Sequence, residues 1–307
     1  MIYTLTLHPA IDRVLEVPGF PDSEVMRSEL VVMLAAGKGF NVSRNLAILG
    51  GESVAAGLVG SPDAAFYSES FGELGVETLL ETHPEPTRQN ITILAPDAGR
   101  EVHLRERGPE VPDEVFEALC SRLCSRLQVG DALAVCGSLP AGVGTAGLEA
   151  LLDAAADAGA TTLLDSSGDG LKFSPRSSPR TLKVNAGELG EFLGEEVEGI
   201  ESAATGAARA LELGPDTVLV TLGARGALCA TGGGVIHAVT AEVEVRNTVG
   251  AGDAFNAGFL WKQAAGLETA LRYAVACGAA QAGSPHIGRL DPAAVEELAA
   301  GAGLRGV

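Results

Sequence analysis

The chain has 307 residues, enough for one large domain with a substantial core that needs no disulfides or metals. Apolar residues make up 46% of it and charged residues 20%, which excludes wholesale disorder. Its 40 acidic and 21 basic side chains give a formal net charge of -19, which repels phosphate backbones and anionic membranes. Neither nucleic acids nor membranes are therefore expected partners.

The cysteines and the apolar runs indicate the expected cellular compartment. The five cysteines form no Cys-x-x-Cys pair of the kind that zinc sites use, so we expect reduced thiols and a cytoplasmic protein. No apolar run reaches the roughly 18 residues that a membrane helix needs.

Strand-like patterns dominate the first third of the chain. Residues 2–7 alternate and include β-branched and aromatic side chains, which predicts a strand and leaves no room before it for a secretion signal. Residues 39–49 have helical spacing and follow a glycine-rich loop. Two further stretches have the spacing of short strands. We interpret them as a small β lid, formed by insertions at about residues 12–34 and 77–106.

From residue 112 onward, strand patterns and helix patterns alternate. Helices are predicted over 112–127, 145–158, 253–265, 267–283 and 292–300, and strands over 132–136, 161–164, 182–184 and 217–221, with two short β segments around 232–234. Such alternation implies right-handed crossovers and a mostly parallel sheet covered on both faces. We therefore expect a single doubly wound α/β domain over residues 1–307.

The segment Gly250-Ala251-Gly252-Asp253 stands at the start of a predicted helix. Glycines there let a ligand approach backbone N–H groups that have no partner within the helix, which makes an anion hole. Asp253 could be an ordinary helix cap. A carboxylate beside an anion hole is also what phosphoryl transfer needs, because the carboxylate accepts a hydroxyl proton and the anion hole stabilises the developing charge.

Gly37-Lys38-Gly39 places one of only four lysines at another helix start. It is not a P-loop, because that motif needs glycine where Val32 stands and Ser or Thr directly after the lysine. The lysine either binds an anion or is simply solvated.

A competing pattern, Gly-x-Gly-x-x-Gly at residues 142–147, precedes a predicted helix, and Asp165 ends the next predicted strand. It matches a dinucleotide fingerprint and keeps an NAD-dependent oxidoreductase as the alternative from a different class. Against it, five residues separate the strand end at Cys136 from Gly142, whereas the fingerprint needs its first glycine in the turn that leaves the strand.

Polar side chains follow several predicted strands, at Asp12, Ser138, Asn185 and Thr221. Because ligands of such sheets bind outside the carboxyl ends of the strands, these positions favour one shared cleft. Asn185 and Glu188 together suit a water-mediated contact with Mg²⁺, although a helix cap explains Asn185 equally well.

Taken together, these segments resemble the ribokinase and phosphofructokinase B family of carbohydrate kinases over essentially the whole chain. The motifs that carry the resemblance lie at residues 4–13, 37–41, 136–142, 164–168, 221–227 and 247–258. Within the family, the 1-phosphofructokinase branch is similar at Ala35-Ala36-Gly37-Lys38-Gly39, Thr87-Arg88-Gln89-Asn90 and Asp165-Ser166-Ser167. The chain departs from the family pattern at His8, where Asn is usual, and at Val184, where Pro is usual.

The resemblance implies a ribokinase-like fold and, with ATP and Mg²⁺, phosphorylation of fructose 1-phosphate at its C6 hydroxyl to give fructose 1,6-bisphosphate and ADP. Tagatose 6-phosphate and fructose 6-phosphate remain alternative substrates. Asp253 would take the hydroxyl proton, and the N–H groups of Gly250, Ala251 and Gly252 would hold the transferring phosphoryl group. The other implied contacts are Asn185 and, through water, Glu188 to Mg²⁺; Thr221, Gly223 and Gly226 to the nucleotide; Asp12, Gly37, Asn41 and Ser138 to sugar hydroxyls; and Lys38, Arg88 and Arg105 to the existing phosphate.

Charge also bears on the substrate and on assembly. A chain of net charge -19 must bind an anion through a few nearby cations, and Lys38, Arg88 and Arg105 favour a phosphorylated sugar over a free one. A phosphate held by the lid turns the opposite end of the ketose toward Asp253, which for a 1-phosphate is the C6 hydroxyl. A 6-phosphate would have to bind reversed. The exposed strand edges of the lid favour a homodimer.

Overall fold

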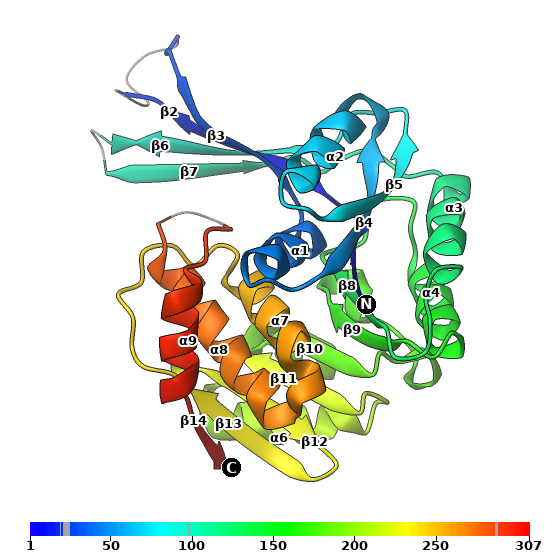
Figure 1. Ribbon diagram of the computed structural model, residues 1–307, viewed down its shortest axis with the longest axis vertical. Coiled ribbons are helices and arrows are strands. Elements are labelled where there is room, and N and C mark those ends of the chain that lie inside the picture. Colours follow the sequence, from blue (N-terminus) through cyan, green and yellow to red (C-terminus); the bar gives the residue numbers. More distant parts are fainter. Residues whose placement is uncertain (19, 21–24, 97–98, 286–287) are drawn as a thin grey trace.

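The computed structural model describes residues 1–18, 20, 25–96, 99–285 and 288–307 (Figure 1). Within these residues the strands form a ten-stranded main sheet in the order β14-β13-β12-β11-β10-β9-β8-β1-β4-β5. Its strands are β1 Ile2–Thr6, β4 Ser53–Gly60, β5 Glu77–His83, β8 Ala132–Cys136, β9 Thr161–Asp165, β10 Thr181–Asn185, β11 Thr217–Thr221, β12 Ala227–Thr231, β13 Gly234–Val239 and β14 Gly303–Gly306.

The main sheet is parallel from β5 to β11, and β12, β13 and β14 extend it in antiparallel fashion. Helices cover both faces. One face carries α3 Asp113–Cys124, α4 Thr145–Asp157, α5 Ala186–Leu193 and α6 Gly199–Leu211; the other carries α1 Lys38–Ile48, α2 Ala64–Gly72, α7 Ala251–Lys262, α8 Leu267–Gly283 and α9 Pro292–Gly301. The doubly wound, mostly parallel sheet is thus confirmed.

Alternation along β8 shows how the sheet joins the two cores. Every residue of β8 is buried, with Leu133 and Val135 packed on the α3–α4 side and Ala132, Ala134 and Cys136 on the α1–α7 side. Side chains of successive strand residues point to opposite faces, so a strand covered on both sides must be apolar throughout.

The lid is a separate four-stranded sheet in the order β3-β2-β6-β7, and it projects from the edge of the body near α2 (Figure 1). Its strands are β2 Ala10–Glu16, β3 Glu29–Ala36, β6 Gln89–Ala95 and β7 Arg100–Arg105. The expected lid boundary at residue 77 is wrong, because β5 pairs with β4 along its whole length and belongs to the main sheet. Residues 19, 21–24 and 97–98 of the expected lid lie outside the described residues.

The sequence analysis did not identify β4, α2, α5 or α6. β4 is buried at every position and shows no alternation, while α6 packs a face of alanine and glycine in place of large apolar side chains. Among the described helices none is both long and apolar enough to cross a membrane. All five cysteines are unpaired, as expected.

Candidate active site

The helix α7 begins with a backbone that only glycine readily adopts. Gly250 is its N-cap residue, with φ at 80°, and no side chain caps this end. Asp253 therefore does not act as the helix cap that one interpretation allowed. The amide of Ala251 donates to the Thr248 carbonyl at 3.2 Å, whereas those of Gly250 and Gly252 have no acceptor within the described part of the chain. The first turn of α7 thus keeps open N–H groups for an anion.

Asp253 is buried, with 6% of its surface exposed, and is oriented by α1. Its Oδ2 accepts a hydrogen bond from Asn41 Nδ2 at 2.8 Å, and Asn41 Oδ1 in turn accepts from Arg44 Nη1 at 3.1 Å. Burial raises the pKa of Asp253 to about 6, although the Asn41 hydrogen bond favours the charged form. A carboxyl with a pKa near neutrality is suited to general base catalysis.

Asp165 holds two lysines next to Asp253. It is fully buried at the end of β9, and its two oxygens accept from Lys38 Nζ and Lys183 Nζ, each at 3.0 Å. Asn256 Nδ2, one helical turn after Asp253, also donates to it at 2.6 Å. Burial opposes ionisation of Asp165, but the two ammonium groups outweigh burial and lower its pKa, so the cluster carries two cations and one anion.

The cluster points toward the anion hole. A Cβ atom on Gly252 would lie 3.1 Å from Lys183 Nζ, so this ammonium group stands against the open turn of α7. Lys38 is half-buried, and its ammonium group also interacts electrostatically with Asp253 and Glu188. The sequence analysis missed Lys183 and Asn256. Their only signals were the scarcity of lysine and the position of Asn256 within the glycine-rich segment.

Asn185 and Glu188 form a capping box at the start of α5. The Glu188 amide donates to Asn185 Oδ1 at 2.9 Å, and the Asn185 amide donates to Glu188 Oε2 at 2.8 Å. The described residues contain no group of three or more His, Cys, Asp or Glu side chains that could hold a metal ion. This pair therefore suits a water-mediated contact with Mg²⁺, which usually keeps several waters, better than a protein cage.

A cavity of about 570 Å³ opens beside the anion hole, between the end of β11 and helices α7 and α8. Four of its lining residues were predicted to contact Mg²⁺ or the nucleotide, namely Asn185, Thr221, Gly223 and Gly226. Apolar side chains also line it, among them Val243, Val245, Phe255 and Val275. A Cβ atom on Gly226 would lie 2.0 Å from the Ala238 carbonyl oxygen, so only glycine fits there. The volume and apolar lining fit a planar base.

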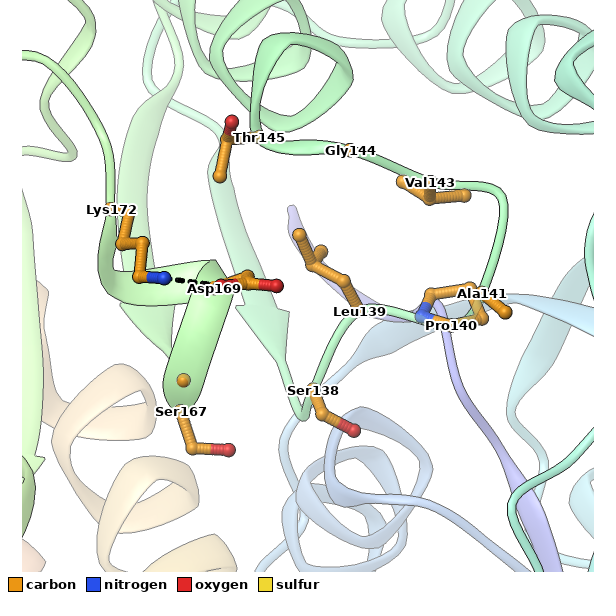
Figure 2. A pocket seen from close by; sticks show the side chains of 11 residues that line it. Ser138, Leu139, Pro140, Ala141, Val143, Gly144, Thr145, Ser167, Asp169 and Lys172 are labelled. Carbon is orange, nitrogen blue, oxygen red and sulfur yellow. Dashed lines mark hydrogen bonds and ion pairs between the residues drawn. The ribbon is translucent and has the colours of Figure 1, made fainter.

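A second cavity, of about 690 Å³, is lined by the loop that follows β8 (Figure 2). Of the predicted site residues it contains only Ser138, and its one ion pair, Lys172 to Asp169 at 2.6 Å, is exposed. Figure 2 shows the Ser138 side chain pointing away from Leu139 and Thr145 on the cavity wall. The larger cavity therefore lacks the buried ion pairs found at Asp165.

The lid contributes a polar row across three strands. Asp12, Asn90 and Arg105 are in register on β2, β6 and β7, and Asn90 Nδ2 donates to Asp12 Oδ1 at 2.7 Å. Burial raises the pKa of Asp12. The Arg105 side chain is exposed and has no hydrogen bond or ion pair to any residue that the structure describes. Of the predicted phosphate ligands, it is the one left open to an incoming anion.

Arg88 instead forms hydrogen bonds to backbone carbonyls at the base of the lid. Its Nε donates to the Pro9 carbonyl and its Nη2 to the His8 carbonyl, each at 3.0 Å. A third bond reaches the Glu106 carbonyl at 3.4 Å. These carbonyls belong to the segments that enter and leave the lid, so Arg88 ties them together. Gly37 is similarly confined, since a Cβ there would lie 2.6 Å from Thr6 Cγ2.

The dinucleotide alternative is wrong on structural grounds. A Cβ on Gly142 would lie 2.2 Å from the Val111 carbonyl oxygen, and one on Gly147 would lie 2.8 Å from the Phe116 ring. These glycines allow close packing against the chain before and within α3. Asp165, the acidic residue of the predicted dinucleotide fingerprint, is fully buried between two lysines and has no room for a ligand.

Comparison with known proteins agrees with this geometry. A sequence model described as "pfkB family carbohydrate kinase" matches residues 5–293. The 1-phosphofructokinase of Rhodobacter capsulatus is 33% identical over 93% of this chain and 92% of its own length, and that of Bacillus subtilis (strain 168) is 33% identical over 94% of each chain. The solved phosphofructokinase-2 from Escherichia coli in complex with potassium has a TM-score of 0.90 and 27% identity, covering 97% of this chain and 98% of that one. The chain belongs to the pfkB family of carbohydrate kinases and is an ATP-dependent sugar kinase.

Proposed function

We propose that the chain transfers the γ-phosphoryl group of ATP to the C6 hydroxyl of fructose 1-phosphate, giving fructose 1,6-bisphosphate and ADP. The observation that carries the proposal is Asp253, a buried carboxyl with a pKa near 6 in the open first turn of α7, hydrogen-bonded to Asn41. The curated relatives named 1-phosphofructokinase point to the same substrate.

In this reaction Asp253 accepts the proton of the C6 hydroxyl as that oxygen bonds to the γ-phosphorus. The bond from the γ-phosphorus to the oxygen that bridges it to the β-phosphorus breaks, and ADP leaves with that oxygen. The open N–H groups at Gly250 and Gly252 would stabilise the charge on the transferring group. When bound, Mg²⁺ would neutralise phosphate charge, with Asn185 and Glu188 oriented by their capping box to meet its waters.

The phosphate ligands divide differently from the sequence expectation. Lys38 and Lys183 share Asp165 next to the anion hole, which supports a role in binding the transferring phosphoryl group. Arg105 on the lid is then the main candidate for the phosphate already on the sugar, with Arg88 holding the base of the lid. A phosphate at the lid leaves the far end of the ketose facing Asp253, which is C6 for a 1-phosphate.

A kinetic comparison tests the substrate. Initial rates of ADP formation with ATP and Mg²⁺ are measured over fructose 1-phosphate, fructose 6-phosphate, tagatose 6-phosphate and ribose. We expect the highest kcat/KM for fructose 1-phosphate and the lowest for ribose, since ribose leaves Arg105 unpaired. A kcat/KM for either 6-phosphate equal to or above that for fructose 1-phosphate contradicts the substrate while leaving the kinase intact.

The lid also supports a homodimer. One row across its sheet, on the face opposite Asp12, consists of Met33, Arg13, Ile91 and Leu104 in register, and Met33 and Leu104 are 47% and 51% exposed. A second copy of the chain would cover this row. Replacing Leu104 by Glu should yield monomers in sedimentation velocity if the dimer forms there. The five unpaired cysteines support a cytoplasmic location.

A further inference from the structure

His8, between β1 and β2, bridges the lid and the body through both of its ring nitrogens. Nε2 lies 2.9 Å from the Arg107 carbonyl oxygen, in the segment that leaves the lid, and Nδ1 lies 3.1 Å from Ser138 Oγ, after β8. The ring is closely confined, because a Cβ on Gly108 would lie 2.7 Å from Nε2. Nothing in the reaction proposed above uses this histidine.

The two contacts fix the tautomer of the ring. A backbone carbonyl can only accept, so the nitrogen facing it, Nε2, must carry a proton. Burial, together with the charge of Arg88, lowers the pKa of His8 to about 4, so the ring is neutral at physiological pH and carries a single N–H. Nδ1 is then an acceptor, and the hydrogen bond from Ser138 to His8 must be donated by the serine hydroxyl.

This commits the only hydroxyl proton of Ser138 to His8. The oxygen of Ser138 keeps lone pairs for a ligand, and these accept hydrogen bonds but cannot donate one. Figure 2 shows the Ser138 hydroxyl pointing away from Leu139 and Thr145, and a Cβ on the residue before it, Gly137, would lie 3.9 Å from Lys38 Cβ. Ser138 therefore lies in the part of the loop that adjoins Lys38 at the proposed site.

We propose that His8 is a positioning residue that makes Ser138 an obligate acceptor, so that Ser138 binds a hydroxyl of the sugar and disfavours its phosphate. The inference rests on the proposed function, in that the substrate is a sugar phosphate. A phosphate dianion offers only acceptor oxygens, and two acceptors facing each other repel. The arrangement therefore orients the substrate, with a hydroxyl at Ser138 and the phosphate directed to Arg105 on the lid.

The first test needs no substrate. In ¹⁵N-labelled protein at pH 7, long-range ¹H–¹⁵N correlation assigns the protonated nitrogen of His8, with a His8→Gln sample to identify its signals. We expect the neutral Nε2–H form, unchanged down to about pH 5. An Nδ1–H form or a charged ring would overturn the proposal, and this result stands whether or not the protein phosphorylates fructose 1-phosphate.

The second test uses a variant that retains one of the two hydrogen bonds of His8 and removes the other. His8→Gln places an amide N–H where Nε2 stands, so it preserves a donor to the Arg107 carbonyl but removes the acceptor for Ser138. We expect the KM for fructose 1-phosphate to rise about 2- to 10-fold, the range of one hydrogen bond, with kcat and the KM for ATP unchanged within twofold. Ser138→Ala should act similarly, and the double variant should be no worse than the worse single one.

Substrate analogues then separate a hydroxyl from a phosphate contact. Inhibition constants are measured for the 3-deoxy and 4-deoxy forms of fructose 1-phosphate and for inorganic phosphate. For one deoxy form we expect wild type and His8→Gln to bind equally, because the hydroxyl that Ser138 accepts from is missing. If His8→Gln binds fructose 1-phosphate as wild type does, if both KM values rise together, or if only inorganic phosphate distinguishes the variants, the proposal is wrong. No turnover of any sugar phosphate by wild type would instead refute the proposed function.

Discussion

The two sides of the proposed cleft are built on different principles. On the body side each charged or amide side chain of the cluster is buried or half-buried and paired: Lys38, Lys183 and Asn256 bind Asp165, and Asn41 binds Asp253. On the lid side Arg105 is exposed, and the row of Met33 and Leu104 is open to solvent. The body thus holds the proposed catalytic groups in place before substrate arrives, whereas the lid leaves side chains open for the proposed contacts with a ligand or a partner.

The largest effect should come from the catalytic base on the body side. Asp253→Asn retains the shape of the side chain but cannot accept the proton of the attacking hydroxyl. We expect kcat to fall by roughly 10² to 10⁴-fold. Binding of fructose 1-phosphate, followed by calorimetry, should stay within a few-fold of wild type. A variant with wild-type kcat would remove Asp253 from the mechanism.

The paired cluster should also dominate stability on the body side. Asp165→Asn leaves the Lys38 and Lys183 ammonium groups next to each other without the carboxylate that they share, and breaking a buried pair in this way costs about 3–5 kcal/mol of unfolding free energy. Urea titration measures the loss. The matched control is Asp169→Asn, which breaks the exposed pair with Lys172 and should leave the midpoint unchanged. Equal effects of both variants would show that burial of Asp165 contributes nothing.

On the lid side the expected effect is on affinity alone. Arg105→Met should raise the KM for fructose 1-phosphate about tenfold, since a charge-assisted hydrogen bond to phosphate is lost, and should leave the KM for ATP unchanged. Lys38→Met should do the opposite, raising the KM for ATP and lowering kcat. If Lys38→Met affects only the sugar phosphate, the original sequence-based assignment of Lys38 is correct and the division between body and lid is not.

The same contrast explains how far the sequence could be followed. The anion hole and its base could be predicted because Gly250, Gly252 and Asp253 are adjacent, so their chemistry is visible in one segment. The Lys38–Asp165 pair joins residues 127 positions apart, and the sequence analysis noted Asp165 only within a dinucleotide pattern and a family motif, not as a partner of Lys38. Only the fold shows that these side chains meet.

Strand assignment failed where local pattern carries no information about partners. β5 has the same strand-like spacing as β6, yet β5 pairs with β4 in the main sheet and β6 pairs with β2 in the lid. Pairing depends on residues distant in sequence. β4 itself went unnoticed because a strand buried on both faces has no alternation to detect.

The smallest effect, and the finest test of the body side, concerns the hydrogen bond to the base. Asp253 must be deprotonated to accept a proton, so kcat/KM should fall as the pH drops through about 6. The Asn41 N–H favours the charged carboxylate, so Asn41→Leu should raise the pKa of Asp253 and move the acidic limb of the profile upward by roughly half to one pH unit. Asn45, one turn further along α1, makes no hydrogen bond to Asp253 in the described structure, so Asn45→Leu should leave the limb in place. A limb that moves equally in both variants would mean that α1 acts through packing and not through this hydrogen bond.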